Sequence, residues 1–124
     1  MTIHKRPLSP HLQIYRLPIT GIISISHRIS GVFLSAGLLF FVYMLLAIAT
    51  GEQNFLAMQS LMSLWIIKLL SLGLIFSLFL HLTHGIRHLI WDIGKTLDKA
   101  TLDKYALFEL LTAVALSLLT FLFV

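Results

Sequence analysis

The chain lacks cysteine entirely, and it has few charged residues for its length. Without a thiol it cannot form a disulfide bond, and it cannot supply cysteine ligands to a metal ion or an iron–sulfur cluster. Charged residues make up only 11% of its 124 residues, whereas 58% are hydrophobic. A soluble domain of this size would not carry so much continuous apolar surface, so the composition predicts a membrane protein.

Three apolar stretches are each long enough to cross a bilayer. Residues 29–49 contain no charge, residues 61–80 contain only Lys68, and residues 105–124 contain only Glu109. A helix of about 20 residues spans the roughly 30 Å of hydrocarbon in a membrane. We therefore predict an all-α membrane protein with three transmembrane helices.

The predicted spans cover about 19–49, 61–93 and 105–124, within a single membrane domain of residues 1–124. The first two exceed the thickness of the bilayer. Their ends are expected to protrude as a docking platform for a soluble partner, or the helices tilt and their charged side chains snorkel. Residues 1–18 contain all three prolines and are expected to be irregular, and they lack the apolar core of a cleaved signal peptide.

Positive charge outside the spans is confined to one side of the predicted membrane domain. It precedes the first span and lies between the second and third: Lys5, Arg6, Arg16, Lys95, Lys99 and Lys104. The other connection, residues 50–60, has no lysine or arginine. The positive-inside rule therefore places the N-terminus in the cytoplasm (or the mitochondrial matrix) and the C-terminus on the opposite, periplasmic side. This one-sided charge does not indicate a nucleic-acid-binding role.

A stripe of ionisable residues lies at the end of the second span. At about 3.6 residues per turn, one helical face carries the following residues: His81, His84, Gly85, His88 and Asp92. Ionisable groups at this depth are costly, so they normally face a partner, a cofactor or a water-filled cavity.

The first span carries a matching polar stripe. Its members follow a helical spacing: Ser24, His27, Arg28, Gly31 and Ser35. Because the second span runs in the opposite direction, the two stripes are expected to meet at one depth, near the cytoplasmic boundary. That arrangement predicts a site between the helices.

A b-type haem is one group that such a site would suit. His81 is the deepest imidazole, and Gly85 one turn on removes a side chain that would block a flat ligand. A haem needs an axial imidazole, a dry slot, and cationic or hydrogen-bonding groups for its propionates near the membrane surface. We therefore take His81 as a candidate axial ligand, with His27, Arg28 and His88 near the propionates.

Two other interpretations of the histidines stay open at this point. They could form a hydrogen-bonded network without haem, or a proton relay through His81, His84 and His88. If haem is bound, His27 is expected to lie shallower than His81, so the second axial ligand is predicted to come from another membrane subunit.

Ser24 and Arg28 lie one turn apart on the first span and could donate hydrogen bonds to a quinone carbonyl. The alternatives are that Arg28 snorkels and that Ser24 bonds back to its own helix. The third span is expected to provide packing and lipid-facing surface only, and no catalytic residue is predicted on this chain.

Two motifs carry a resemblance to a known family. The first is Arg6-Pro7-Leu8-Ser9-Pro10-His11-Leu12 followed by the eight residues from Ser24 to Gly31, and the second is the H-x-x-x-G-I-R-H-x-x-x-D-x-G pattern from His81 to Gly94. With three spans in a chain of this length, the sequence resembles the cytochrome b membrane-anchor subunit of succinate dehydrogenase, complex II.

The resemblance implies a hetero-oligomeric helix bundle. Such an anchor pairs with a second small three-helix subunit and attaches a flavoprotein and an iron–sulfur protein to the bacterial inner membrane or the mitochondrial inner membrane. Electrons from succinate, an intermediate of the tricarboxylic acid cycle, then pass to ubiquinone. An anchor of a fumarate reductase, which works in the opposite direction, is the alternative within this class.

The resemblance also implies roles for single residues. His81 matches the family's haem ligand, and the haem b is shared with the second anchor subunit. Ser24 and Arg28 match quinone-binding positions, whereas His27 and His88 match positions near the propionates. His84 falls where the motif leaves the residue open.

Overall fold

The computed structural model describes residues 16–123, and this part of the chain contains four α-helices and no strand. They are α1 (Ile19–Ala49), α2 (Glu52–Ser63), α3 (Trp65–Asp92) and α4 (Lys99–Phe123). Three of them, α1, α3 and α4, are long and apolar enough to cross a membrane. The prediction of an all-α protein with three transmembrane helices is therefore confirmed.

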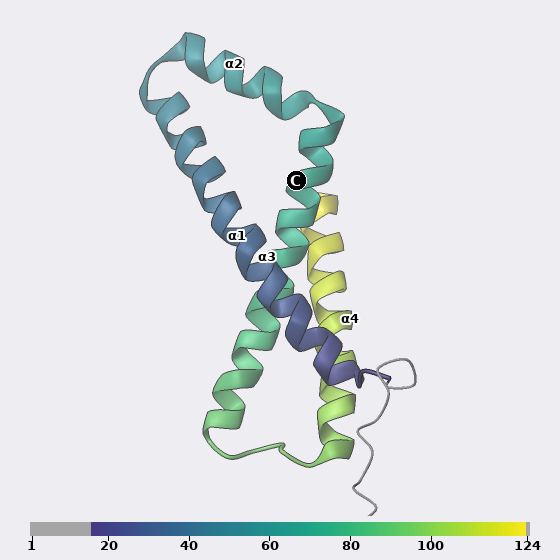
Figure 1. Ribbon diagram of the computed structural model, residues 1–124. Helices are drawn as coiled ribbons and strands as arrows, with labels where there is room; N and C mark the ends of the chain where they lie inside the picture. The colour runs from purple at the N-terminus through teal and green to yellow at the C-terminus, as the bar shows by residue number, and fades with distance from the viewer. Residues whose placement is uncertain (1–15, 124) are drawn as a thin grey trace, which may run out of the picture.

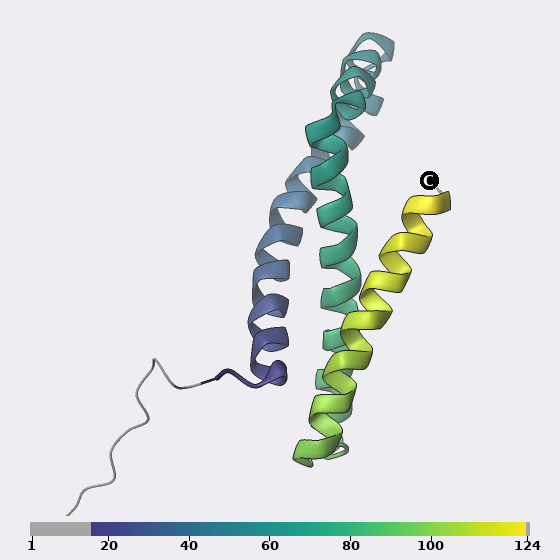
Figure 2. The same ribbon diagram turned by 90° about the vertical axis from the view of Figure 1, so that its right-hand side faces the viewer.

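The helices pass back and forth between two ends of the molecule (Figure 1). The start of α1 and the α3–α4 connection lie toward one end, and α2 bridges α1 and α3 at the other. α1 crosses α3 at an angle, whereas α4 runs beside α3 and moves away from it toward its C-terminal end (Figure 2). The predicted antiparallel course of the first two spans is thus present, and α3 lies between the other two.

Local sequence signals explain where α3 ends and α4 begins. Gly94 adopts a φ of 77°, and its N–H donates to the Trp91 carbonyl while Lys95 N–H donates to the Ile90 carbonyl, which closes α3 in a Schellman motif. Asp98 then accepts a hydrogen bond from the N–H of Thr101 at 3.0 Å and caps α4.

The boundaries of the second and third spans differ from the predicted ones. Residues 50–60 were expected to form a loop, but they contain most of α2, which continues to Ser63. The chain is extended at Leu64, with ψ at 134°, so α3 begins at Trp65 instead of residue 61. α4 begins at Lys99 instead of residue 105 because Asp98 caps it there.

Small residues set how closely the helices approach. A Cβ at Gly37 would lie 2.6 Å from the Cδ2 atom of Leu74, so glycine lets α1 approach the Leu74 side chain of α3 closely. Ala106 and Ala113 are fully buried on α4. Most large apolar side chains face outward instead, for example Val32, which is 72% exposed, and Leu122, which is 75% exposed. An isolated chain in water would not tolerate this surface, which suits lipid and neighbouring subunits.

A candidate histidine cluster between the helices

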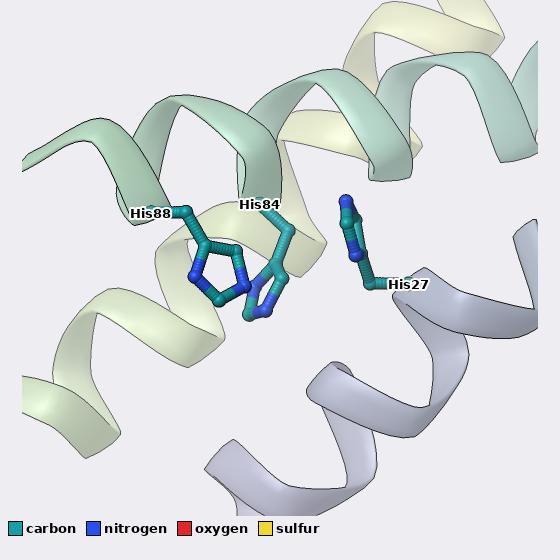
Figure 3. A group of neighbouring side chains, drawn as sticks. All are labelled: His27, His84 and His88. Carbon is teal, nitrogen blue, oxygen red and sulfur yellow. The ribbon is translucent and has the colours of Figure 1, made fainter. Parts of the chain in front are cut away.

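The two polar stripes predicted from the sequence meet where α1 passes α3. His27 of α1 lies 3.9 Å from His81 of α3, measured between ring centroids, and 4.8 Å from His84. His88 lies one turn further along α3, with its ring centroid 4.8 Å from that of His84. Figure 3 shows His27 projecting from α1 toward the space beside His84 and His88. The structure therefore brings four histidines into one cluster.

One ring nitrogen of His81 is held by α1. Its Nδ1 atom lies 3.2 Å from the His27 carbonyl oxygen and 3.1 Å from the Ser30 hydroxyl. Because the Ser30 hydroxyl itself donates to the His27 carbonyl, Nδ1 is assigned as the N–H donor of the ring. In the neutral ring the other nitrogen, Nε2, then carries the lone pair, and it has no hydrogen-bond partner within residues 16–123. This is the arrangement of a metal-binding histidine oriented through its second nitrogen.

Two glycines leave room around His81. A Cβ at Gly31 would lie 3.2 Å from the Cε1 atom of His81, so glycine allows α1 to approach this ring. A Cβ at Gly85 would meet nothing within 4 Å, so the wall of α3 is open one turn beyond His81. A half-buried imidazole with a free Nε2 beside an open face is compatible with an axial haem ligand.

The depth difference expected between the His27 and His81 rings is limited to 3.9 Å, the distance between their ring centroids. Their rings stack face to face, with an interplanar angle of 15°, and so lie side by side. His27 nevertheless cannot be the second axial ligand in this arrangement. Two axial imidazoles approach iron edge-on from opposite faces of a porphyrin, and rings in van der Waals contact leave no space for that porphyrin.

The expectation that the third span contributes packing only is wrong. Glu109 of α4 is buried, and its Oε2 atom lies 2.8 Å from Nδ1 of His84. Its Oε1 atom lies 2.9 Å from Nη1 of Arg87. Trp91 covers the Arg87 guanidinium, which lies 4.6 Å from the ring centroid. An ion network therefore joins α3 to α4 beside the histidines.

A signal for this network was present in the sequence. Glu109 is the single charge of an otherwise apolar span, and a buried carboxylate requires a cation. Once α3 and α4 are placed antiparallel, Arg87 is the cation whose position along the helix pair is nearest to that of Glu109. Helical spacing within the second span does not link Arg87 to Glu109, so the sequence pattern predicts no role for Arg87.

The three remaining imidazoles converge on a common space. One ring nitrogen from each of His27, His84 and His88 lies within 4.8 Å of the others. The Nε2 atoms of His27 and His84 are buried, and neither has a hydrogen-bond partner in the described part of the chain. Such a cluster could accept a metal ion or an external group with acceptor oxygens.

Ser24 and Arg28 lie one turn apart on α1, half-buried and exposed respectively. Neither side chain makes a hydrogen bond to another residue between 16 and 123, so Ser24 does not bond back to its own helix there. Both are free to contact a molecule outside this part of the chain. The motif Arg6–Leu12 lies outside the described residues, as do Lys5 and Val124.

Comparison with known proteins relates the chain to one family. A family described as the succinate dehydrogenase/fumarate reductase transmembrane subunit matches residues 2–120. A succinate dehydrogenase cytochrome b560 subunit of Chondrus crispus is 40% identical over 121 residues, which cover 94% of this chain and 92% of the relative. A cytochrome b556 subunit of Paracoccus denitrificans is 36% identical over 93% of this chain and 88% of its own length. A mitochondrial cytochrome b560 subunit of Sus scrofa is 40% identical over 88% of this chain and 66% of its own length.

Proposed function

This chain belongs to the succinate dehydrogenase/fumarate reductase transmembrane subunit family, and on that premise we propose that it is the haem b-carrying membrane anchor of a succinate dehydrogenase. It would attach a flavoprotein and an iron–sulfur subunit to the membrane together with a second three-helix anchor. Relatives come from bacteria and from mitochondria, and we propose the inner membrane of either as its location.

The haem proposal rests on the hydrogen bonding of the two ring nitrogens of His81. Its Nδ1 proton is held by the His27 carbonyl at 3.2 Å, which leaves Nε2 as the available ligand atom. A haem bound there would supply reversible one-electron storage near the quinone. The second axial ligand would come from the partner anchor, because His27 stacks on His81 and cannot oppose it.

Three residues are proposed to hold the haem propionates. His27 and His88 present ring nitrogens to one space, and Arg28 is an exposed cation one residue beyond His27. Propionates are anionic, and imidazole N–H groups and a guanidinium are suitable donors to them.

Ser24 and Arg28 are proposed to bind ubiquinone. Reduction of a quinone to a quinol takes two electrons and two protons and places negative charge on its oxygens before protonation. A guanidinium and a hydroxyl one turn apart can donate hydrogen bonds to one such oxygen and stabilise that charge. Neither side chain makes a hydrogen bond to another residue in the described part of the chain, so both can donate to a quinone.

Oxidation of succinate would take place on the soluble subunits. This chain has no cysteine to hold iron–sulfur clusters, so its role is to place the quinone near a cluster of its partner. The family name covers both directions of the reaction, and a fumarate reductase anchor is the alternative within it.

The haem proposal is tested by the absorption spectrum of the purified complex. We expect a reduced b-type band in the wild type that is lost in His81→Ala. Thr83→Val is a matched control on α3, because the Thr83 hydroxyl bonds only to carbonyls of its own helix among the described residues. A complex without any b-type band would favour the haem-free network or the proton relay instead.

The quinone proposal is tested separately. Arg28→Ala should reduce the rate of ubiquinone reduction at least tenfold, while succinate oxidation by an artificial acceptor at the soluble subunits continues. Equal loss of both activities would show that Arg28 serves assembly of the complex.

A further inference from the structure

Ser30 is a buried polar residue at the point where α1 passes α3, with only 3% of its surface exposed. Its hydroxyl donates to the His27 carbonyl at 2.6 Å, three residues back in the same helix. Serines in membrane helices commonly make this bond, which satisfies the hydroxyl proton and leaves the oxygen able to accept a second bond. The role of Ser30 therefore depends on which atom lies against its oxygen.

The atom that lies against the Ser30 oxygen is Nδ1 of His81, at a distance of 3.1 Å. The same Nδ1 atom lies 3.2 Å from the His27 carbonyl oxygen. A carbonyl oxygen can only accept, and the single hydroxyl proton of Ser30 is already donated to it, so both oxygens need a proton from Nδ1. The Nδ1–H is therefore shared between two acceptors, and the hydroxyl proton joins those acceptors to each other.

The Ser30 hydroxyl strengthens the hydrogen bonding of the His81 ring in two ways. It accepts from Nδ1–H, and its own donation to the carbonyl polarises its oxygen and makes that oxygen a better acceptor. Donation from Nδ1 moves electron density toward the second ring nitrogen, which becomes a more basic ligand. Nε2 of His81 is not enclosed by the described residues, unlike Nε2 of His27 and of His84, so a ligand can reach it.

We propose that Ser30 is a positioning residue that keeps the proton of His81 on Nδ1 and raises the basicity of Nε2, the proposed iron ligand. This inference rests on the haem proposed at His81, and it assigns a role to a serine outside the proposed quinone and propionate sites. A more basic axial imidazole favours ferric over ferrous iron, so Ser30 lowers the midpoint potential of the haem. The ligand lies on α3 and both of its acceptors lie on α1, so the crossing of two helices within one chain sets the strength of the ligand.

The surroundings of Ser30 allow the effect of its hydroxyl to be separated from the effect of packing. Ser30 lines a groove of about 450 Å³, whose walls also include Ile29, Phe76 and Leu80. A methyl group added at residue 30 has room in this groove. Threonine therefore keeps the hydroxyl and changes the shape of the side chain, whereas alanine removes the hydroxyl alone.

The test is a redox titration of the b-type absorption band in the intact membrane complex. Ser30→Ala should shift the midpoint potential upward, because Nδ1–H keeps only the 3.2 Å contact with the His27 carbonyl. Ser30→Thr should restore the wild-type potential, because the threonine hydroxyl can make the same bonds. Ser117→Ala is the matched control and should leave the potential unchanged. Ser117 is also a buried serine that donates to its own helix, with no bond to His81 among the described residues.

An unchanged or lowered potential in a haem-containing Ser30→Ala complex would overturn the inference. Equal shifts in Ser30→Ala and Ser30→Thr would also overturn it, because they would reflect packing and not the hydroxyl. If Ser30→Ala does not assemble, Ser30→Cys replaces it, because a thiol is only a weak acceptor, and the same upward shift is expected. A wild-type complex without haem is a different outcome, because it refutes the proposed function itself.

Discussion

Glu109 stabilises the molecule by compensating a buried cation. Arg87 is 4% exposed and Glu109 5% exposed, and their charged atoms lie 2.9 Å apart. Such a pair contributes little net stability compared with two apolar residues, but removal of one partner leaves the other charge buried and alone. The network therefore holds α4 against α3 in one register.

We predict that Glu109→Ala destabilises the assembled complex by about 3–5 kcal/mol, because Arg87 loses its counter-charge. Arg87→Leu combined with Glu109→Leu should recover most of that loss. Thermal unfolding of the purified complex measures both variants. Equal destabilisation by the single and the double variant would show that the pair does not interact energetically.

Gly31 has no side chain, which lets the His81 imidazole lie close to α1. A Cβ at this residue would lie 3.2 Å from Cε1 and 3.7 Å from Nδ1 of the imidazole, so Gly31→Ala would push the ring by a few tenths of an ångström. We expect this variant to weaken haem retention or broaden the b-type band. Gly73→Ala is the matched control, because a Cβ there meets nothing within 4 Å, and it should behave as the wild type.

At the scale of the helices, the sequence predicts the long apolar elements well and the breaks between them poorly. The first span was expected at about 19–49, and α1 covers Ile19–Ala49. Length and hydropathy determine such an element. The break at Leu64 has no proline, glycine or charge to mark it, and it lies where the chain turns from α2, which bridges α1 and α3, into α3.

The site also has features that the sequence predicts and features that it does not. The histidine stripe follows from helical spacing alone, since every member lies on one helix. The contact of His84 with Glu109 depends on how α4 packs on α3, and no spacing within one helix encodes that. The stacking of His27 on His81 likewise depends on the crossing of α1 and α3.

The Asp98 cap makes the stability of the first turn of α4 depend on pH. Hydrogen bonds from the Thr101 hydroxyl and N–H hold the pKa of the Asp98 carboxyl below its ordinary value. A lowered pKa means that the ionised carboxylate stabilises the folded state, fully above the ordinary pKa and no longer once the pH falls through the folded pKa. The first turn of α4 should therefore fray at low pH.

Asp98→Ala tests this cap. Amides at the start of α4 should exchange with deuterium faster in the variant than in the wild type at neutral pH, as measured by mass spectrometry. The difference should disappear below the folded pKa of Asp98. A difference that persists at low pH would mean that the hydrogen bonds to Thr101 do not depend on ionisation.

At the scale of the whole molecule, the chain is one part of a larger site. Its apolar side chains face outward along α1 and α4, and Nε2 of His81 has no partner within residues 16–123. A single three-helix chain can orient one axial imidazole, but it leaves the opposite side of the proposed iron for another subunit. We therefore predict bis-histidine ligation that exists only in the assembled complex.

Near-infrared magnetic circular dichroism of the oxidised complex tests this claim most directly, because the charge-transfer band of a low-spin haem identifies its axial ligands. We predict a bis-histidine band in the wild type and a histidine–methionine band in His81→Met, with haem retained. A bis-histidine band that persists unchanged in His81→Met would show that other residues hold the iron and would contradict the account.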